Sequence, residues 1–128
     1  RHLAERTGVT VTGRVPDVRA YLKHASVAVA PLRIARGVQN KVLEALAMAR
    51  PVVCTSSAAE GIDPSGGAVA GIADDAESFA AATLGSMGLG DRTAARQLVV
   101  ERFSWGSHLR VVDELIASAI ASDPGRPA

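Results

Sequence analysis

Short apolar runs recur along the first half of the chain at lengths typical of strands. Val9–Thr12 is β-branched throughout and predicts a short strand, while Ser26–Ala30 and Pro51–Thr55 are almost wholly apolar and predict strands buried on both faces. A weaker fourth strand is predicted at Gly66–Gly71. Strands of this kind are typical of parallel sheets covered by helices, so the pattern favours an α/β fold.

Helical periodicity fills the segments between these runs. Asp17 is expected to cap a helix that ends near Ala25 and packs on one face, and a second helix is expected from about Val38 to Ala49. Strands that alternate with helices imply right-handed crossovers. We therefore predict a Rossmann-like parallel sheet of about four strands, flanked by helices.

The last third of the chain has helical patterns only. Asp74 or Asp75 is expected to begin one helix, Asp91 to cap a second and Ser104 to cap a third. The third helix has the clearest helical period, and we expect its apolar stripe to pack rather than to bind a ligand. That stripe consists of Trp105, Leu109, Val112, Leu115, Ile116, Ala119 and Ile120.

Composition supports one globular domain and excludes several classes of protein. The chain has 128 residues, of which 48% are hydrophobic and 21% charged. A formal net charge of +1 and an aromatic content of 3% argue against a nucleic-acid-binding surface. A single cysteine excludes an internal disulfide, and no apolar run is long enough to span a membrane, so a cytoplasmic protein is expected.

Candidate ligand-binding residues gather where the second predicted helix begins. In open α/β sheets, ligands bind at the carboxyl ends of strands, where helix N-termini direct free N–H groups into a crevice. The cations there suit phosphate, and Gly37 permits close approach of the backbone to a ligand. The polar residues of this entrance are Arg33, Arg36, Gly37, Gln39, Asn40, Lys41 and Glu44.

Glu44 lies one turn further along the helix, on the face that also carries Asn40 and Lys41. Phosphate would repel this carboxylate, whereas vicinal ribose hydroxyls would donate to it, so the combination points to a nucleotide. The alternative is an ordinary solvated helix on which Lys41 and Glu44 form a weak surface pair. Spacing alone weighs the two interpretations equally.

The remaining reactive side chains have structural interpretations. The histidines lie on separate predicted elements without metal-ligand spacing, and no metal is expected. They are His2, His24 and His108. Cys54 has no neighbouring base and is interpreted as a core residue, and Ser56–Ser57 lack the motif of a hydrolase nucleophile. Asp74–Asp75 is attributed to helix capping, and Glu60–Gly61 fits a turn or a ligand contact equally well.

Several segments together resemble the C-terminal domain of family 4 glycosyltransferases, which have the GT-B fold. They are Gly13–Asp17, Pro31–Leu32, Gly37–Val53 and Phe103–Trp105. The similarity extends from Val9 to about Ile116, and its most diagnostic part is Asn40–Lys41 with Glu44 and Pro51–Val53. The version with Arg36 before Gly37 is similar to exopolysaccharide-type transferases.

The resemblance implies a domain that binds the nucleotide-sugar donor of a retaining, hexosyltransferase-like enzyme. Glu44 matches the second glutamate of the family signature, which is associated with the ribose hydroxyls. The first would fall at position 36, where Arg36 is free to hold the diphosphate or an acidic sugar. Gly37 matches the glycine that faces the sugar-phosphate part of the donor.

The implied donor-binding set extends to the loop that lies against the base. Arg36 and Lys41 would stabilise the leaving diphosphate, with neither a metal nor another cofactor. The full set is Gly13, Arg14, Val15, Arg33, Arg36, Gly37, Gln39, Asn40, Lys41 and Glu44.

The same resemblance implies parts that this sequence lacks, namely an acceptor-binding N-terminal domain and two first strand–helix units. Residues 1–128 are expected to be a partial, N-terminally truncated donor-binding domain of a bacterial-type enzyme, inactive by itself. An open sheet edge favours self-association, and contact with a membrane surface would come only through the absent parts. The alternatives are a non-catalytic nucleotide- or phosphate-binding module, receiver-like in fold, and a scaffold that associates with a partner domain.

Overall fold

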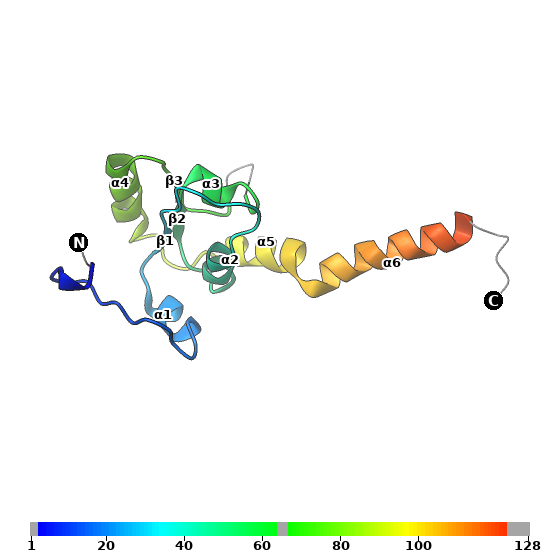
Figure 1. Cartoon of the computed structure of the whole chain (residues 1–128), viewed down its shortest axis with the longest axis horizontal. Helices are drawn as coiled ribbons and strands as arrows, with labels where there is room; N and C mark the ends of the chain where they lie inside the picture. The colour runs from blue at the N-terminus through cyan, green and yellow to red at the C-terminus, as the bar shows by residue number, and fades with distance from the viewer. Residues whose placement is uncertain (1–2, 64–66, 123–128) are drawn as a thin grey trace.

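A computed structural model describes residues 3–63 and 67–122, apart from the side chain of His108. Strands and helices alternate along the body of the protein, and helices alone follow (Figure 1). In chain order the elements are η1 Leu3–Glu5, α1 Arg19–His24, β1 Ala28–Ala30, α2 Asn40–Ala47, β2 Val52–Cys54, α3 Ser56–Ala59, β3 Gly71–Ile72, α4 Ala76–Ser86, α5 Thr93–Phe103 and α6 Trp105–Ser122.

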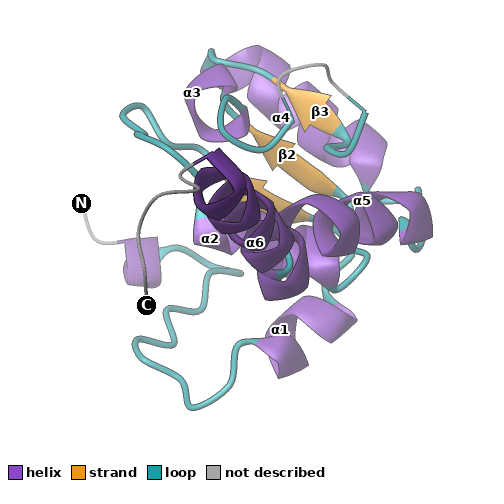
Figure 2. Ribbon diagram, turned by 90° about the vertical axis from the view of Figure 1, so that its right-hand side faces the viewer, coloured by secondary structure: helices purple, strands orange, loops and turns teal. Residues whose placement is uncertain are grey.

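The sheet has three parallel strands in the order β1-β2-β3, which confirms the predicted α/β class. Ala28 pairs with Val52, and Val53 pairs with Gly71. Because β2 lies between two neighbours and is covered on both faces, every residue of it is buried. Figure 2 shows the sheet between its helices.

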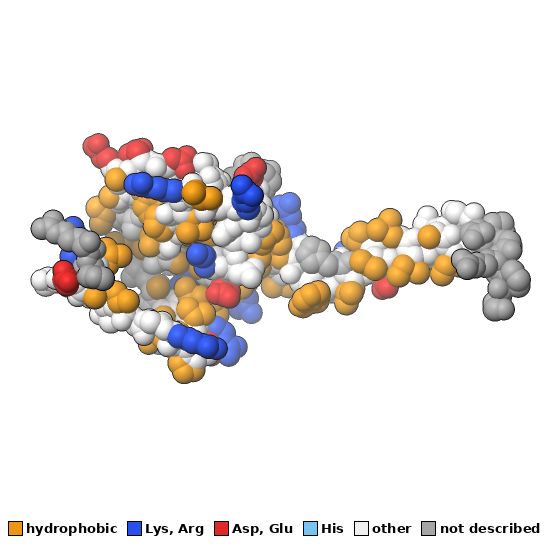
Figure 3. Space-filling model, viewed as in Figure 1, with side chains coloured by type: hydrophobic (Ala, Val, Ile, Leu, Met, Phe, Trp, Pro, Cys, Tyr) orange, Lys and Arg blue, Asp and Glu red, His pale blue; other side chains and the backbone are white. Residues whose placement is uncertain are grey.

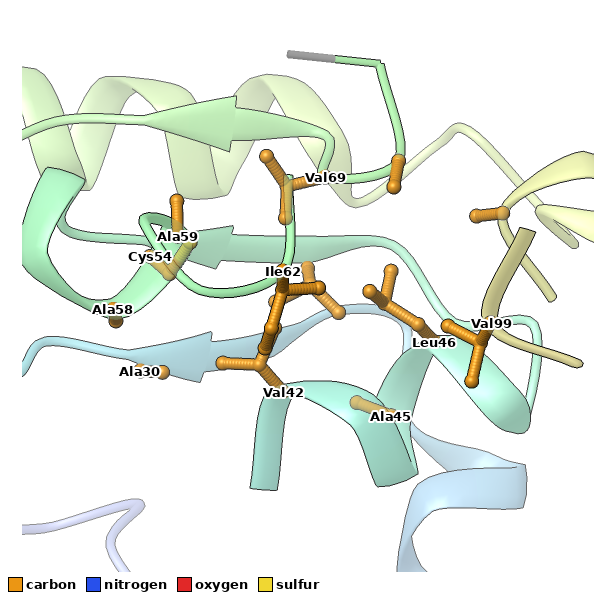
Figure 4. Close-up of a cluster of buried hydrophobic side chains, with 13 residues drawn as sticks. Ala30, Val42, Ala45, Leu46, Cys54, Ala58, Ala59, Ile62, Val69 and Val99 are labelled. Carbon is orange, nitrogen blue, oxygen red and sulfur yellow. The ribbon is translucent and has the colours of Figure 1, made fainter. Parts of the chain in front are cut away.

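Successive side chains of β2 point to opposite faces of the sheet, each toward a different layer of helices. Val53 lies on the face that α4 covers, since a Cβ on the paired Gly71 would contact both Val53 and Ala82. Val52 and Cys54 point to the opposite face and belong to the main core. There they join Val42, Ala45 and Leu46 of α2, Ile62, and Val99 of α5 (Figure 4).

Two predicted strands are corrected by the structure. Val9–Thr12 is irregular and exposed, because no strand among the described residues lies beside it to complete a hydrogen-bonded ladder. The last strand is Gly71–Ile72 rather than Gly66–Gly71, whose first residue lies outside the described residues. The N–H groups of residues 67–69 donate to the carboxylate of Asp63, so they are not available to a neighbouring strand.

Helix caps are partly as predicted. Asp75 caps α4, accepting from the N–H groups of Glu77 and Ser78 at 3.1 and 2.9 Å, and Ser104 accepts from Ser107 at the start of α6. The prediction for Asp91 is wrong: Arg92 precedes α5, and Asp91 instead pairs with Arg50, in the turn between α2 and β2.

Asp17 stands one residue before the N-cap of α1 and accepts from the N–H of Arg19 at 2.9 Å. The predicted packing of this helix holds only for Leu22, which contacts the core, while Tyr21 is 54% exposed.

The α6 helix extends away from the body as an arm (Figure 1), and its contacts with the body are chiefly with α5. The helix itself is confirmed, but its expected packing is not. Trp105 is 82% exposed, and Leu109 to Ile120 of the stripe also face solvent, as the hydrophobic side chains along the arm in Figure 3 show. Among the described residues, no helix combines the length and apolarity needed to cross a bilayer.

Candidate functional site

The α2 helix begins at the carboxyl edge of the sheet because β1 ends at Ala30 and the chain turns back through residues 31–39, the β1–α2 loop. One face of α2 is buried through Val42, Ala45 and Leu46. The opposite face carries Asn40, Lys41 and Glu44, all exposed. The sequence pattern therefore placed the polar residues of this helix on the correct side.

The N-terminus of α2 has no side-chain cap, in contrast to those of α3 and α4, which Thr55 and Asp75 cap. Gln39 precedes the helix in an extended conformation, and its carbonyl oxygen accepts from the N–H groups of Val42 and Leu43. The N–H groups of the first helical residues, Asn40 and Lys41, are left for water or a ligand. Such an uncapped N-terminus favours an anion through these donors and the helix dipole.

The side chain of Gln39 holds the β1–α2 loop closed through hydrogen bonds to the backbone of the loop. Gly37 has a φ of 65°, in the left-handed region that glycine adopts without strain. The Gln39 side-chain nitrogen donates to the carbonyl oxygens of Arg36 and Gly37, at 3.1 Å in each case. Gln39 thus shapes the loop with the same amide group that was expected to contact the donor.

The cations around this helix entrance form no ion pair with the described residues. Arg33, Arg36 and Lys41 are exposed, and the salt bridges of the described part of the chain join Arg19 to Asp17 and Arg50 to Asp91. Lys41 and Glu44 therefore do not form the surface pair that was the alternative interpretation. Their charges are available to a ligand.

The structure does not join the N-terminal part of the predicted site to α2. Gly13 and Arg14 are exposed and Val15 is half-buried, in a long loop outside the sheet (Figure 2). The hydrogen bonds of this loop are local, as in the bond from Thr12 to the Gly13 carbonyl oxygen. The sequence-predicted residues that the fold brings together are those of the β1–α2 loop and α2.

Two acidic residues that follow β3 are engaged in structural bonds. The carboxylate of Asp74 accepts from the N–H of Ser56 at 2.9 Å and from its hydroxyl at 2.8 and 2.9 Å. The bond from the Ser78 N–H, followed by those from its side chain and from the Glu77 N–H, lowers the pKa of Asp75. The capping interpretation of Asp75 is confirmed, and within the described residues no group of potential ligands could hold a metal ion.

Cys54 is a buried residue of β2, as predicted. Burial, and to a smaller extent the negative charges of Asp63 and Asp74, together raise the pKa of its thiol to about 11. A thiol with this pKa stays protonated at neutral pH and is a poor nucleophile.

Comparison with known protein families indicates the class of enzyme to which the chain belongs. The family model described as Glycosyl transferases group 1 matches residues 1–87 of the 128. The chain belongs to this family. No curated protein and no solved structure matches the chain. As a group 1 glycosyltransferase, the protein belongs to enzymes of glycosyl transfer, and the matched residues contain the whole sheet, the β1–α2 loop and α2.

The segment Thr55–Gly61 was expected at the carboxyl edge of the sheet, but the sequence analysis predicted neither its short helix α3 nor its contacts with the β1–α2 loop. The Thr55 hydroxyl donates to the Leu32 carbonyl oxygen at 2.7 Å, and Gly61 lies directly against the backbone of Gly37. Glu60–Gly61 was interpreted either as a turn or as a ligand contact. In the structure Gly61 lies in close contact with the backbone of Gly37, and Glu60 is exposed. A threonine followed by Ser56 and Ser57 is a common helix start, and that signal could have revealed α3.

Beside this segment the group 1 glycosyltransferase has a hollow of about 290 Å³ at the carboxyl edge of the sheet. It extends from the β1–α2 loop to the start of α4. The lining residues are Pro31, Arg33, Thr55, Asp74, Asp75, Ala76, Phe79 and Ala80. Arg33 therefore borders both the α2 entrance and this hollow.

Proposed function

We propose that this chain is the donor-binding part of a retaining glycosyltransferase of family 4, which moves a sugar from a nucleotide diphosphate to a glycan or other acceptor. The observation that carries the proposal is the uncapped N-terminus of α2, beside Arg36 and Lys41, which are exposed and form no ion pair with the described residues, in a chain of this family. Fixed N–H groups and cations of this kind bind a diphosphate without further rearrangement.

In the proposed reaction, the bond between the anomeric carbon and the diphosphate oxygen breaks, and its electron pair leaves with the diphosphate. The anomeric carbon bonds to an acceptor hydroxyl oxygen on the same face, and the proton of that hydroxyl goes to the leaving diphosphate oxygen. Arg36, Lys41 and the N–H groups of α2 stabilise the charge on the leaving diphosphate. Glu44 accepts hydrogen bonds from the ribose hydroxyls, and the Gly13–Val15 loop lies against the base.

The first test is a titration of the isotope-labelled 128-residue chain with UDP and with GDP, followed by NMR. We expect the amide resonances of Gly37 to Glu44 to shift, because the proposed phosphate and ribose contacts lie there. Lys41→Ala should raise the Kd about tenfold through loss of one charge-assisted contact. Lys23→Ala, which removes the same charge from the exposed end of α1, is the matched control and should leave the Kd unchanged.

The Glu44→Gln variant tests the binding of the ribose separately from the binding of the phosphates. The change should weaken the binding of UDP about tenfold but leave the binding of inorganic pyrophosphate unchanged or stronger, because only the nucleotide has the diol. No response to UDP or GDP at millimolar concentration would refute the donor site.

We also propose that residues 1–128 are a partial donor-binding domain of an exopolysaccharide-type enzyme. Further strand–helix units and an acceptor-binding domain would complete that enzyme. The acceptor must be held against the donor in a closed cleft before transfer occurs. The 128-residue chain alone is therefore expected to transfer no sugar from UDP- or GDP-sugars. Formation of a labelled glycan by the purified chain would contradict this expectation.

A further inference from the structure

The β1–α2 loop rests on the segment Thr55–Gly61, which comes from the next strand of the sheet. Thr55 follows β2 directly and is buried, and its hydroxyl donates to the Leu32 carbonyl oxygen near the start of the loop. The same hydroxyl accepts from the N–H of Ala58 at 3.4 Å and so caps α3. One side chain thus connects the start of the loop to the start of α3.

The second support is at the other end of the loop. A Cβ on Gly61 would lie 2.9 Å from the carbonyl carbon of Gly37 and 3.0 Å from both the Gly37 oxygen and the Val38 nitrogen. All three are backbone atoms, so no flexible side chain could move aside. The backbone of Gly61 itself lies outside the left-handed region, so the need for glycine here comes from the close contact alone.

We propose that Thr55 and Gly61 are positioning residues for the donor phosphates. The inference rests on the proposed function, because it concerns the direction in which the loop and the first N–H groups of α2 point. Gln39 closes the loop on itself, and Thr55 and Gly61 fix the closed loop against the sheet at Leu32 and Gly37. With both ends held, the cations and N–H groups at the helix entrance are set before the ligand arrives.

Gly61→Ala tests this support, with Gly85→Ala as its control. The added methyl group must push the backbone of Gly37 and Val38 away. A shift of the backbone that holds the phosphate-binding groups is expected to lower affinity about tenfold or more. Gly85 is an exposed residue of α4 whose added Cβ would meet nothing within 4 Å. We expect Gly61→Ala to raise the Kd for UDP at least about tenfold and Gly85→Ala to leave it unchanged.

Thr55 provides a second test with a conservative rescue. Thr55→Val keeps the shape but removes the hydroxyl, whereas Thr55→Ser keeps it. Serine should therefore retain UDP binding and valine should not. Val99→Ala, a core change in α5 remote from the loop, controls for lost stability alone and should leave the Kd unchanged at a temperature where all variants are folded.

The NMR spectra of the free chains distinguish failure of this inference from failure of the proposed function. Gly61→Ala should shift the Gly37 and Val38 resonances before any nucleotide is added. If those resonances stay in place, or if the variant binds UDP as the wild type does, the positioning role is refuted. If they shift but the wild type binds neither UDP nor GDP, the proposed function fails while the support of the loop by Gly61 stands.

Discussion

Asp63→Ala is expected to lower the free energy of unfolding by about 3 kcal/mol, because buried N–H groups that lose a charged acceptor each cost about 1 kcal/mol or more. One carboxylate oxygen of Asp63 accepts from the N–H groups of Gly67, Ala68 and Val69 at 2.8, 2.7 and 3.1 Å. The side chain is 5% exposed, and Ala68 and Val69 are buried with it. Gly67 is exposed, whereas the bonds to Ala68 and Val69 are buried, so most of the loss comes from these two N–H groups.

Urea unfolding followed by circular dichroism measures this loss. Asp63→Asn is the matched variant, because its amide oxygen can occupy the same position without the charge and should retain part of the stability. A loss below about 1 kcal/mol in the alanine variant would show that the three bonds contribute little net stability.

Leu46→Ala is expected to lower the free energy of unfolding by about 3 kcal/mol, the usual cost of a cavity at a fully buried leucine. Leu46 has no exposed surface and lies among the side chains that join α2 to β2 and α5 (Figure 4). The neighbours come from three elements, so they cannot all move inward to fill the space.

Leu84→Ala is the control for this core change. Leu84 lies on α4 and is 70% exposed, so its truncation should change the free energy of unfolding by less than about 0.5 kcal/mol in the same urea experiment. Equal losses in the two variants would mean that Leu46 does not belong to the core as described.

The strands β1 and β2 and the helix α2 could be located because their evidence is local: β1 and β2 lie inside the predicted runs Ser26–Ala30 and Pro51–Thr55. The expected burial on both faces is confirmed for β2 but wrong for β1, where Val29 is 50% exposed because α4 packs chiefly on β2 and β3. Val9–Thr12 has equally good strand residues, but a strand also needs a neighbour, and sequence composition does not show whether one is present. The short α3 helix has no complete helical period, and only its N-cap, Thr55, could have indicated it from the sequence.

The residues of the candidate site likewise include some that a local pattern predicts and others that only the folded structure brings together. Lys41 and Glu44 could be predicted because the helical period separates them from the buried residues of α2. The inward bonds of Gln39 and the contact between Gly61 and Gly37 depend on how distant segments approach one another. No spacing in the sequence shows that contact. The placement of Gly13–Val15 against a base stays a prediction, since their hydrogen bonds are local.

The α6 arm affects how the stability of this protein is observed. Because its apolar side chains face solvent, α6 gains little from the core and is held mainly by its own backbone bonds. Such a helix loses its ends gradually on heating, while the body around the sheet unfolds as a unit. A helical circular dichroism signal therefore contains a sloping contribution from the arm. The exposed indole of Trp105, at the junction, reports the arm rather than the core.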